Sequence, residues 1–477
     1  MRSFDFFDTL AARLYLDPFS VFRLVEEKYP FPNFVQLRRQ AAQMSNGTLV
    51  DIYQHFSNLS GISQSEADHL LQFEWEMEKA HLIPIQKNLQ LVQDGDLIIS
   101  DTYYTQSQIE ELLRLIGCTK KVVVFATPAG KASGAIWLQM RLTFSIEKHL
   151  GDNLHSDVLA PTQFGISAEL CTNSDLTPLE KQAFDAGQKD LSLLIRTLRL
   201  INPYSRREMP GALWQEQVSH TIPIYILFAL YLHEYCQQHQ IQKILFSSRD
   251  CESLASIFSA LFPSYHSLYF HCSRVVYSHP TQEYIDYVKS VYHPNCLIVD
   301  GFGSGMSCTN FFQKHFQCTP KYLAMIASAP QTQGAIHWPG RTKWEMLNYS
   351  DQGSLIGFDK TGPIRLPSEY REISLKPAYD CLSACLKYLP HFQFSTCNAN
   401  LMNLWHNNLQ TTNLQLEFFY VQNHLAKYLE QQVSAYINHT TPLFMSASES
   451  LRIAQAIQHI APDLPLAARN FIRDVHK

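Results

Sequence analysis

The chain has 477 residues, a formal net charge of −5, 46% hydrophobic residues and 17% charged residues. This length predicts two or three domains of roughly 100–200 residues each. The hydrophobic share excludes a largely disordered chain. The slight acidity argues against nucleic acid as the main partner, because nucleic-acid-binding proteins normally carry a basic excess.

Three features of the sequence indicate a cytoplasmic protein without a transmembrane segment. The first five residues lack the charged and apolar pattern of a secretory signal. The most apolar stretch, Ile222–Leu232, is shorter than the about 20 residues that a spanning helix needs, so it predicts a buried core helix. Eleven cysteines are scattered without a Cys-x-x-Cys pair, which favours a reducing compartment.

The first third of the chain alternates apolar runs with helical patterns. We expect strands at Ser3–Phe7, Leu97–Ser100 and Lys121–Phe125, and a short one that ends at Gly151. A long helical stretch, from about 18 to 90, separates the first two. Strands that alternate with helices predict a parallel α/β sheet.

A second α/β series follows a break near residue 175. After helices at 178–200 and 217–239, strands are expected at 243–246, 267–270, 296–300 and 322–326. The tail from about 375 is predicted to be mainly helical. We therefore predict two domains, 1–175 and 176–477.

Polar residues follow the strands of the first series and predict where its chemistry lies. They are Asp5, Asp8, Ser100, Lys131, Asp152 and Asp157. Ligands bind beyond the carboxyl ends of strands in parallel α/β sheets. A carboxylate can attack phosphorus, a hydroxyl and a lysine can bind the transferred group, and two further carboxylates suit Mg²⁺.

In their order, these residues resemble the motifs of the haloacid dehalogenase-like (HAD) hydrolase superfamily. Asp5-Phe6-Phe7-Asp8-Thr9-Leu10 is similar to its first motif, Ser100 to the second, Lys131 in Gly130–Gly134 to the third, and Gly151–Asp157 to the acidic fourth. The resemblance implies a Rossmann-like parallel sheet, with the segment at about 18–90 as a helical cap of the first type. It implies Asp5 as nucleophile, and Mg²⁺ held by Asp5, the Phe7 backbone carbonyl, Asp152 and Asp157.

The opening residues and the segments around Ser100 and Asp152 also resemble one branch of predicted HAD hydrolases. That branch often carries an additional C-terminal region and is frequently associated with surface-polysaccharide genes. Ser248-Arg249-Asp250 and the segment 298–305 are similar to that region. This resemblance does not name a substrate. Because the Asp152 and Asp157 pair favours a metal-dependent reaction, we expect a phosphatase that acts on a small phosphorylated metabolite, such as a sugar phosphate or nucleotide.

One position departs from the phosphatase pattern. Phosphatases of the superfamily usually carry a second Asp two residues after the nucleophile, where this chain has Phe7. Asp8 or a cap residue could supply the proton instead. The alternatives are a metal-independent haloacid dehalogenase-like hydrolase and a non-catalytic binding or scaffold protein.

The second series contains a possible anion site. Asp300-Gly301-Phe302-Gly303-Ser304-Gly305 ends a strand and precedes a helix, and Arg249-Asp250 follows a neighbouring strand. Glycines at such a turn let backbone N–H groups approach a phosphate. The segment faintly resembles the phosphoribosyl-pyrophosphate loop, which leaves a phosphoribosyltransferase-like activity open, whereas the structural alternative is a tight turn with a buried Arg249–Asp250 pair. The C-terminal helices could bind a protein partner.

Overall fold

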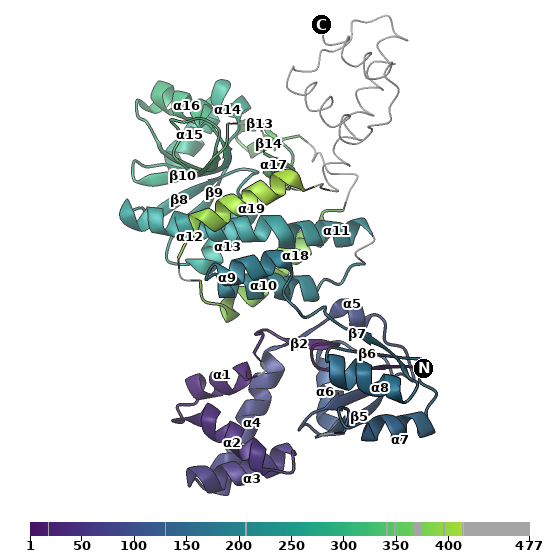
Figure 1. Ribbon diagram of the computed structural model, residues 1–477. Helices are drawn as coiled ribbons and strands as arrows, with labels where there is room; N and C mark the ends of the chain where they lie inside the picture. The colour runs from purple at the N-terminus through teal and green to yellow at the C-terminus, as the bar shows by residue number, and fades with distance from the viewer. Residues whose placement is uncertain are drawn as a thin grey trace, which may run out of the picture. The chain divides into compact units, whose positions relative to one another are not determined.

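The computed structural model describes residues 1–414, apart from positions 18, 129, 206–207, 340–341, 348–349, 351, 367–373, 395 and 413. It divides the chain into two compact units, each built on a parallel sheet with helices around it (Figure 1). The first unit comprises Met1–Ser205 and Lys387–Phe394. The second comprises Arg206–Leu386 and the described residues beyond Ser395.

A five-stranded parallel sheet in the order β5-β4-β1-β6-β7 forms the centre of the first unit. The strands are β1 (Arg2–Phe4), β4 (Leu97–Asp101), β5 (Val123–Thr127), β6 (Lys148–Gly151) and β7 (Ser167–Leu170). The predicted parallel α/β sheet is therefore confirmed, and β7 is an additional edge strand. The strand order reverses between β1 and β6, and ligands bind at such a switch point in open α/β sheets.

Helices cover both faces of this sheet because its strands are apolar on both faces. Successive side chains of a strand point to opposite faces, so Ile98 joins one hydrophobic core while Leu97 and Ile99 join another. The connecting helices are α6 (Gln106–Leu115), α7 (Ala135–Thr143), η1 (Leu154–Leu159) and α8 (Ala160–Gln163). Thr105 begins α6 with a capping box to Gln108.

The helical stretch predicted at about 18–90 forms a block of four helices. They are α1 (Ser20–Lys28), α2 (Phe34–Met44), α3 (Leu49–Ser60) and α4 (Gln64–Ala80). The block is inserted between two short antiparallel strands, β2 (Ala11–Arg13) and β3 (Leu82–Pro84), and α5 (Gln86–Leu89) follows. Of the two strands in this ribbon, β3 lies inside the region expected to be helical, whereas β2 precedes it. Strands of three residues are too short to leave a clear periodicity.

The structure divides the chain after Ser205 rather than near the predicted boundary at 175. Helices α9 (Pro178–Asp185) and α10 (Lys189–Leu200) belong to the first unit because arginines of α10 bond back onto it. Arg196 donates to the carbonyl oxygens of Ser174 and Arg13, and Arg199 pairs with Glu180 at 2.6 Å.

The second unit has its own five-stranded parallel sheet, in the order β12-β11-β10-β8-β9. Its strands are β8 (Lys243–Ser247), β9 (His266–Phe270), β10 (Cys296–Gly303), β11 (Lys321–Ala327) and β12 (Gly334–His337). The four strands predicted here are confirmed, and β12 adds an edge. Because the order reverses between β8 and β10, the carboxyl ends of these two strands form the switch point.

Helices and one antiparallel hairpin complete the second unit. Its helical elements are α11 (Met209–Glu216), η2 (Gln217–Thr221), α12 (Ile222–Gln238), α13 (Glu252–Leu261), α14 (Arg274–Ser278), α15 (Gln282–Val291), α16 (Met306–Phe316), α17 (Trp344–Leu347), α18 (Lys376–Tyr388) and α19 (Ala399–Thr411). Between α18 and α19, the short η3 (Leu389–His391) belongs to the first unit. The hairpin pairs β13 (Leu355–Asp359) with β14 (Gly362–Arg365).

The apolar run Ile222–Leu232 lies in α12, where nearly all of its side chains are buried, as the sequence predicts. Among the described residues, no helix is long and apolar enough to cross a membrane. The predicted helical tail begins with α18 and α19, and its remainder from 415 onward lies outside the described residues.

Candidate active site

Asp5 lies at the switch point of the first sheet, directly after β1. Its backbone N–H donates to the carbonyl oxygen of Leu150 at 2.9 Å, so the pairing of β1 with β6 extends to this residue. Phe4 and Phe6 on either side are buried in the core, and they anchor the backbone from which the carboxylate projects. The Asp5 residue is 6% exposed, so its charge requires partners.

Lys131 supplies the principal partner. Its Nζ lies 2.8 Å from Asp5 Oδ1 and donates to Asp157 Oδ1 at 2.7 Å. Burial alone lowers the pKa of Lys131, but the two carboxylates raise it above its usual value, so the side chain is a permanent cation. Lys120 and Lys121, the competing lysines in the sequence, lie before β5 at the opposite end of that strand. Lys131, the lysine chosen from the sequence, is thus the one that contacts Asp5.

Asp157 is fully buried beneath the site. Its Oδ2 accepts the backbone N–H of Asn153 at 3.0 Å, and His149 Nε2 lies 3.4 Å from its Oδ1. Burial raises the pKa of Asp157, but the bond from His149 and the charge of Lys131 together lower it to about 2. An ionised carboxylate can only accept, so His149 donates from Nε2, while its Nδ1 lies 2.8 Å from the Ser3 hydroxyl.

Gly151 makes this packing possible. A Cβ at this position would lie 2.4 Å from both Cβ and Cγ of Asp157. Any larger residue would therefore displace the Asp157 carboxylate from Lys131. The glycine of the predicted fourth motif is thus required for close approach of the buried acid.

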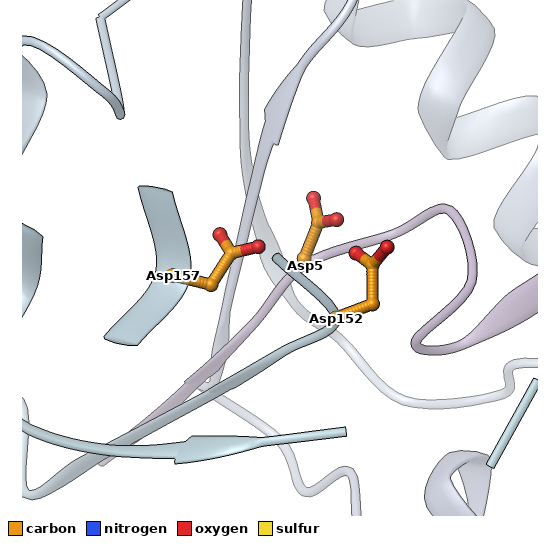
Figure 2. A group of neighbouring side chains, drawn as sticks. All are labelled: Asp5, Asp152 and Asp157. Atoms are coloured by element: carbon orange, nitrogen blue, oxygen red, sulfur yellow. The ribbon is translucent and has the colours of Figure 1, made fainter. Parts of the chain in front are cut away.

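Asp152 completes a group of three carboxylates. Figure 2 shows the carboxylates of Asp152 and Asp157 on either side of Asp5, and one ligand oxygen from each of the three lies within 4.8 Å of the others. Burial and then the charges of Asp5 and Asp8 raise the pKa of Asp152 to about 8. Negative charge thus exceeds what Lys131 neutralises, and oxygen donors in this arrangement suit a hard divalent cation.

Ser100 and Asp101 end β4, the neighbour of β1. Ser100 is buried, two residues beyond Ile98, which pairs with Phe4. The carboxylate of Asp101 accepts the Lys131 backbone N–H at 3.2 Å, and burial raises its pKa. This contact holds the loop that carries Lys131 against the end of β4.

Phe7 and Asp8 occupy the turn that follows Asp5. The Phe7 ring packs edge-on against Phe6 and lies 4.4 Å from the Arg13 guanidinium, so its side chain forms an apolar wall. Asp8 adopts a left-handed backbone conformation with φ of 53°. Its Oδ1 lies 3.6 Å from Arg196 Nη2, and burial raises its pKa although Arg196 and Arg13 lower it.

Two residues near the site are missing from the sequence prediction. His149 orients Asp157, and Arg196 reaches Asp8 from α10, far along the chain. A signal for Arg196 does exist, because it lies in the run Leu193-Leu194-Ile195-Arg196-Thr197-Leu198, all of which is buried. A charged residue inside such a run needs a buried partner.

The residues predicted for a second anion site lie together in the second unit. All of them line one cavity at the switch point between β8 and β10, and they are Arg249, Asp250, Asp300, Gly303, Ser304 and Gly305. The sequence places them at two neighbouring strand ends, and the observed strand order brings those ends side by side.

No protein-family model matches the chain, and no curated protein matches it significantly. The two sites are therefore interpreted from their own geometry.

Proposed function

We propose that the first unit is a HAD-like, Mg²⁺-dependent phosphohydrolase that forms an aspartyl-phosphate on Asp5. One observation carries the proposal: the Asp5 carboxylate lies at the switch point, 2.8 Å from Lys131 Nζ and beside the acids Asp152 and Asp157. A nucleophilic carboxylate, a fixed cation and spare acids are the groups that phosphoryl transfer requires.

The residues present fit the implied metal. Asp5 and Asp152 are the direct candidates to hold Mg²⁺, with the Phe7 carbonyl as an expected third ligand. Both Asp157 oxygens already accept hydrogen bonds, which suits this acid to orient Lys131 and to reach a cation through water. When bound, Mg²⁺ supplies positive charge that neutralises the carboxylates and the phosphoryl oxygens.

The proposed reaction has two chemical steps. An Asp5 carboxylate oxygen attacks phosphorus, and the bond from phosphorus to the leaving alkoxide breaks as the alkoxide gains a proton. Water then attacks the phosphorus of the aspartyl-phosphate, which releases inorganic phosphate and restores the Asp5 carboxylate. Lys131 neutralises the phosphoryl oxygens throughout, and the Ser100 hydroxyl donates a hydrogen bond to them.

Protonation of the leaving group is the step in which this site departs from the usual phosphatase pattern. Phe7 cannot donate a proton, and the nearest acid along the chain is Asp8. Burial raises the pKa of Asp8, which favours its protonated form as a donor, whereas its Arg196 contact opposes this. We therefore expect esters with good leaving groups, which need little proton assistance, to be the better substrates.

The helical block α1–α4 is proposed to act as the cap that selects the substrate. Arg13 on the ribbon pairs with Glu78 of α4 at 2.9 Å, and Glu78 also accepts a bond from Tyr104, which follows β4. These buried bonds tie the block to the end of the sheet that carries Asp5. The metabolite is thus expected to contact both Phe7 and the block.

Phosphate release from a panel of phosphomonoesters tests the proposal. Wild-type protein should release phosphate only with Mg²⁺, and Asp5→Asn should reduce turnover at least about a thousandfold, as loss of a nucleophile does. Asp185→Asn, at an exposed position of α9 outside the helical block, is the matched control and should retain full activity. Undiminished turnover in Asp5→Asn would exclude the aspartyl-phosphate.

A metal-independent dehalogenase is the alternative that the apolar side chain at Phe7 favours. Halide release from haloacids in the presence of chelator distinguishes it from the phosphatase. Such release, together with no phosphatase activity in Mg²⁺, would replace the proposed function.

A further inference from the structure

The switch point of the second sheet carries a cavity that the chemistry of the first unit does not use. It has a volume of about 460 Å³ and is lined by loops that follow β8, β9, β10 and β11. Small-molecule sites typically measure about 300–1,000 Å³ and occur at such switch points. All of its lining residues belong to the second unit.

One part of the cavity wall supplies hydrogen-bond donors suited to an anion. Helix α16 begins there at Met306 and has no acidic residue in its first turn, so its N-terminal N–H groups favour negative charge. Arg249, after β8, and Arg274, at the start of α14, also line the cavity. Guanidinium groups recognise phosphate oxygens through paired hydrogen bonds.

The loop before α16 is fixed in place by its neighbours. The Gly303 carbonyl accepts the Ser328 N–H at 3.1 Å, and the Ser304 carbonyl accepts the Thr332 hydroxyl at 2.8 Å. Gly305 has a φ of 68°, and a Cβ there would lie 2.8 Å from the Tyr322 ring. Glycine is therefore needed at this position by the turn itself, and the loop is preorganised rather than formed by a ligand.

Another part of the wall supplies acceptors. Asp300 Oδ2 accepts the Tyr322 hydroxyl at 2.7 Å, and its Oδ1 accepts the Gly301 N–H at 2.9 Å. Burial, and then the Asp300 charge, raises the pKa of Tyr322 well above its usual value, so this hydroxyl remains a donor. Asp250 lines the cavity beside Asp300, close enough that its Cβ would lie 3.1 Å from a Cβ at position 301.

The mixture of groups narrows the chemical class of the ligand. A site for phosphate alone would gain nothing from two carboxylates, which repel it. Carboxylates instead accept hydrogen bonds from hydroxyl groups, while arginines and helix N–H groups bind phosphate. The ligand that suits these donors and acceptors is therefore a molecule with a phosphate at one end and several hydroxyl groups at the other.

We propose that the cavity between β8 and β10 binds a phosphate ester of a polyhydroxyl compound, either a sugar phosphate or a nucleotide. Arg249, Arg274 and the start of α16 bind the phosphate, and Asp250 and Asp300 bind ring hydroxyls. This site is distinct from the proposed phosphatase centre, with which it shares no residue.

Calorimetric titration of the full chain, with chelator present to weaken the first site, tests the proposal. The probes are glucose 1-phosphate, glucose 6-phosphate, AMP, UMP, inorganic phosphate, glucose and adenosine. At least one phosphate ester should bind more tightly than inorganic phosphate and than its unphosphorylated parent. The sugar phosphates and the nucleotides separate the two sources of this chemistry.

Variants assign the binding to this cavity. Arg274 is exposed and can be replaced without risk to folding, so Arg274→Gln should raise the Kd at least tenfold with an unchanged melting temperature. Arg249→Gln should have the same effect. Lys289→Gln, which removes an exposed cation of the same unit outside the cavity, and Asp152→Asn, in the first unit, should leave the Kd unchanged.

Three results would overturn the proposal. The first is that the wild-type protein binds none of the probes. The second is that it binds inorganic phosphate as tightly as the phosphate esters. The third is that the phosphate ester still binds with unchanged Kd in both Arg274→Gln and Arg249→Gln. Binding that is lost in Asp152→Asn but retained in the arginine variants would belong to the first unit and would count against this cavity, whether or not the phosphatase proposal holds.

Discussion

At the residue scale, the first site is organised by an imbalance of charge. Lys131 is the only cation in direct contact with Asp5 and Asp157 among the described residues, and Asp152 adds a third acid. Lys131 stabilises the buried carboxylates of Asp5 and Asp157, whereas Asp152 is left with a raised pKa.

Mg²⁺ binding should release a proton near neutral pH. In the metal-free protein Asp152 is largely protonated below a pH of about 8, and a cation needs the carboxylate. The affinity for Mg²⁺ should therefore increase as the pH rises toward about 8, by at most about tenfold per pH unit, because one proton is released. Calorimetry in buffers of different ionisation enthalpy measures the proton, and Asp152→Asn should abolish both the proton release and the affinity gain.

The raised pKa of Asp152 also makes the free energy of unfolding of the metal-free protein depend on pH. The folded-state pKa of Asp152 lies above its ordinary value of 3.8, so the folded state binds the extra proton between 3.8 and about 8. The contribution of Asp152 to stability is therefore present at low pH and lost as the pH rises through about 8. Asp152→Asn should remove this dependence in denaturant titrations.

Lys131→Met should unfold the first unit more easily. Removing one partner of a buried ion pair leaves uncompensated charge, which costs about 3–5 kcal/mol. Lys120→Met, at an exposed position, should change the free energy of unfolding by less than about 0.5 kcal/mol. Equal stability of the two variants would contradict the role given to Lys131.

At the element scale, the helical block is held together by a second buried ion pair. Arg38 of α2 makes a bidentate bond to Glu74 of α4, with both contacts at 2.8 Å. Tyr53 of α3 donates to the same carboxylate at 2.7 Å, and the Arg38 guanidinium lies over the rings of Phe22 and Tyr103. One cluster therefore joins all four helices to the loop that follows β4.

Removing one partner of the Arg38–Glu74 ion pair should destabilise the first unit more than replacing both partners with apolar residues. Arg38→Met leaves the Glu74 charge buried, so it should lower the free energy of unfolding of the first unit by about 3–5 kcal/mol. Arg38→Met combined with Glu74→Leu removes both charges and should recover most of that loss. Chemical denaturation of Arg38→Met, of Glu74→Leu and of the double variant measures the coupling energy between the two side chains. If the two single losses in the free energy of unfolding simply add in the double variant, the two side chains are not coupled and the prediction is wrong.

At the scale of the whole molecule, the eleven cysteines all lie within the described residues and are free thiols. Eight are buried, and three, Cys118, Cys318 and Cys397, are partly exposed. Burial raises the pKa of Cys236, Cys272 and Cys385 to about 12 each, which suppresses the reactive thiolate.

Thiol titration should therefore separate the native from the unfolded chain. Ellman's reagent should react quickly with no more than the three partly exposed cysteines of the native protein, and with all eleven in guanidinium chloride. Omitting reductant during purification should leave the melting temperature unchanged. Fast reaction of most thiols in the native state would contradict the packing of both units.

The local sequence was sufficient to predict the α/β class and most of the central strands, because alternating runs of apolar residues and helical patterns are local signals. It also singled out Asp5, Ser100, Lys131, Asp152 and Asp157, because polar residues of these types recur in order near the ends of the expected strands. The short strands β2, β3 and β7 were missed because three or four residues carry too little periodicity.

Only the tertiary structure decided which strand ends meet. The orders β5-β4-β1-β6-β7 and β12-β11-β10-β8-β9 are set by pairing between segments that are far apart in the chain, and no local pattern encodes them. This pairing brings Asp152 beside Asp5 and places Arg249 and Asp300 on the wall of one cavity, whereas α10 adds Arg196 from beyond the predicted boundary. The residue types at the strand ends were thus determined locally, but their chemistry depends on the distances that long-range packing imposes.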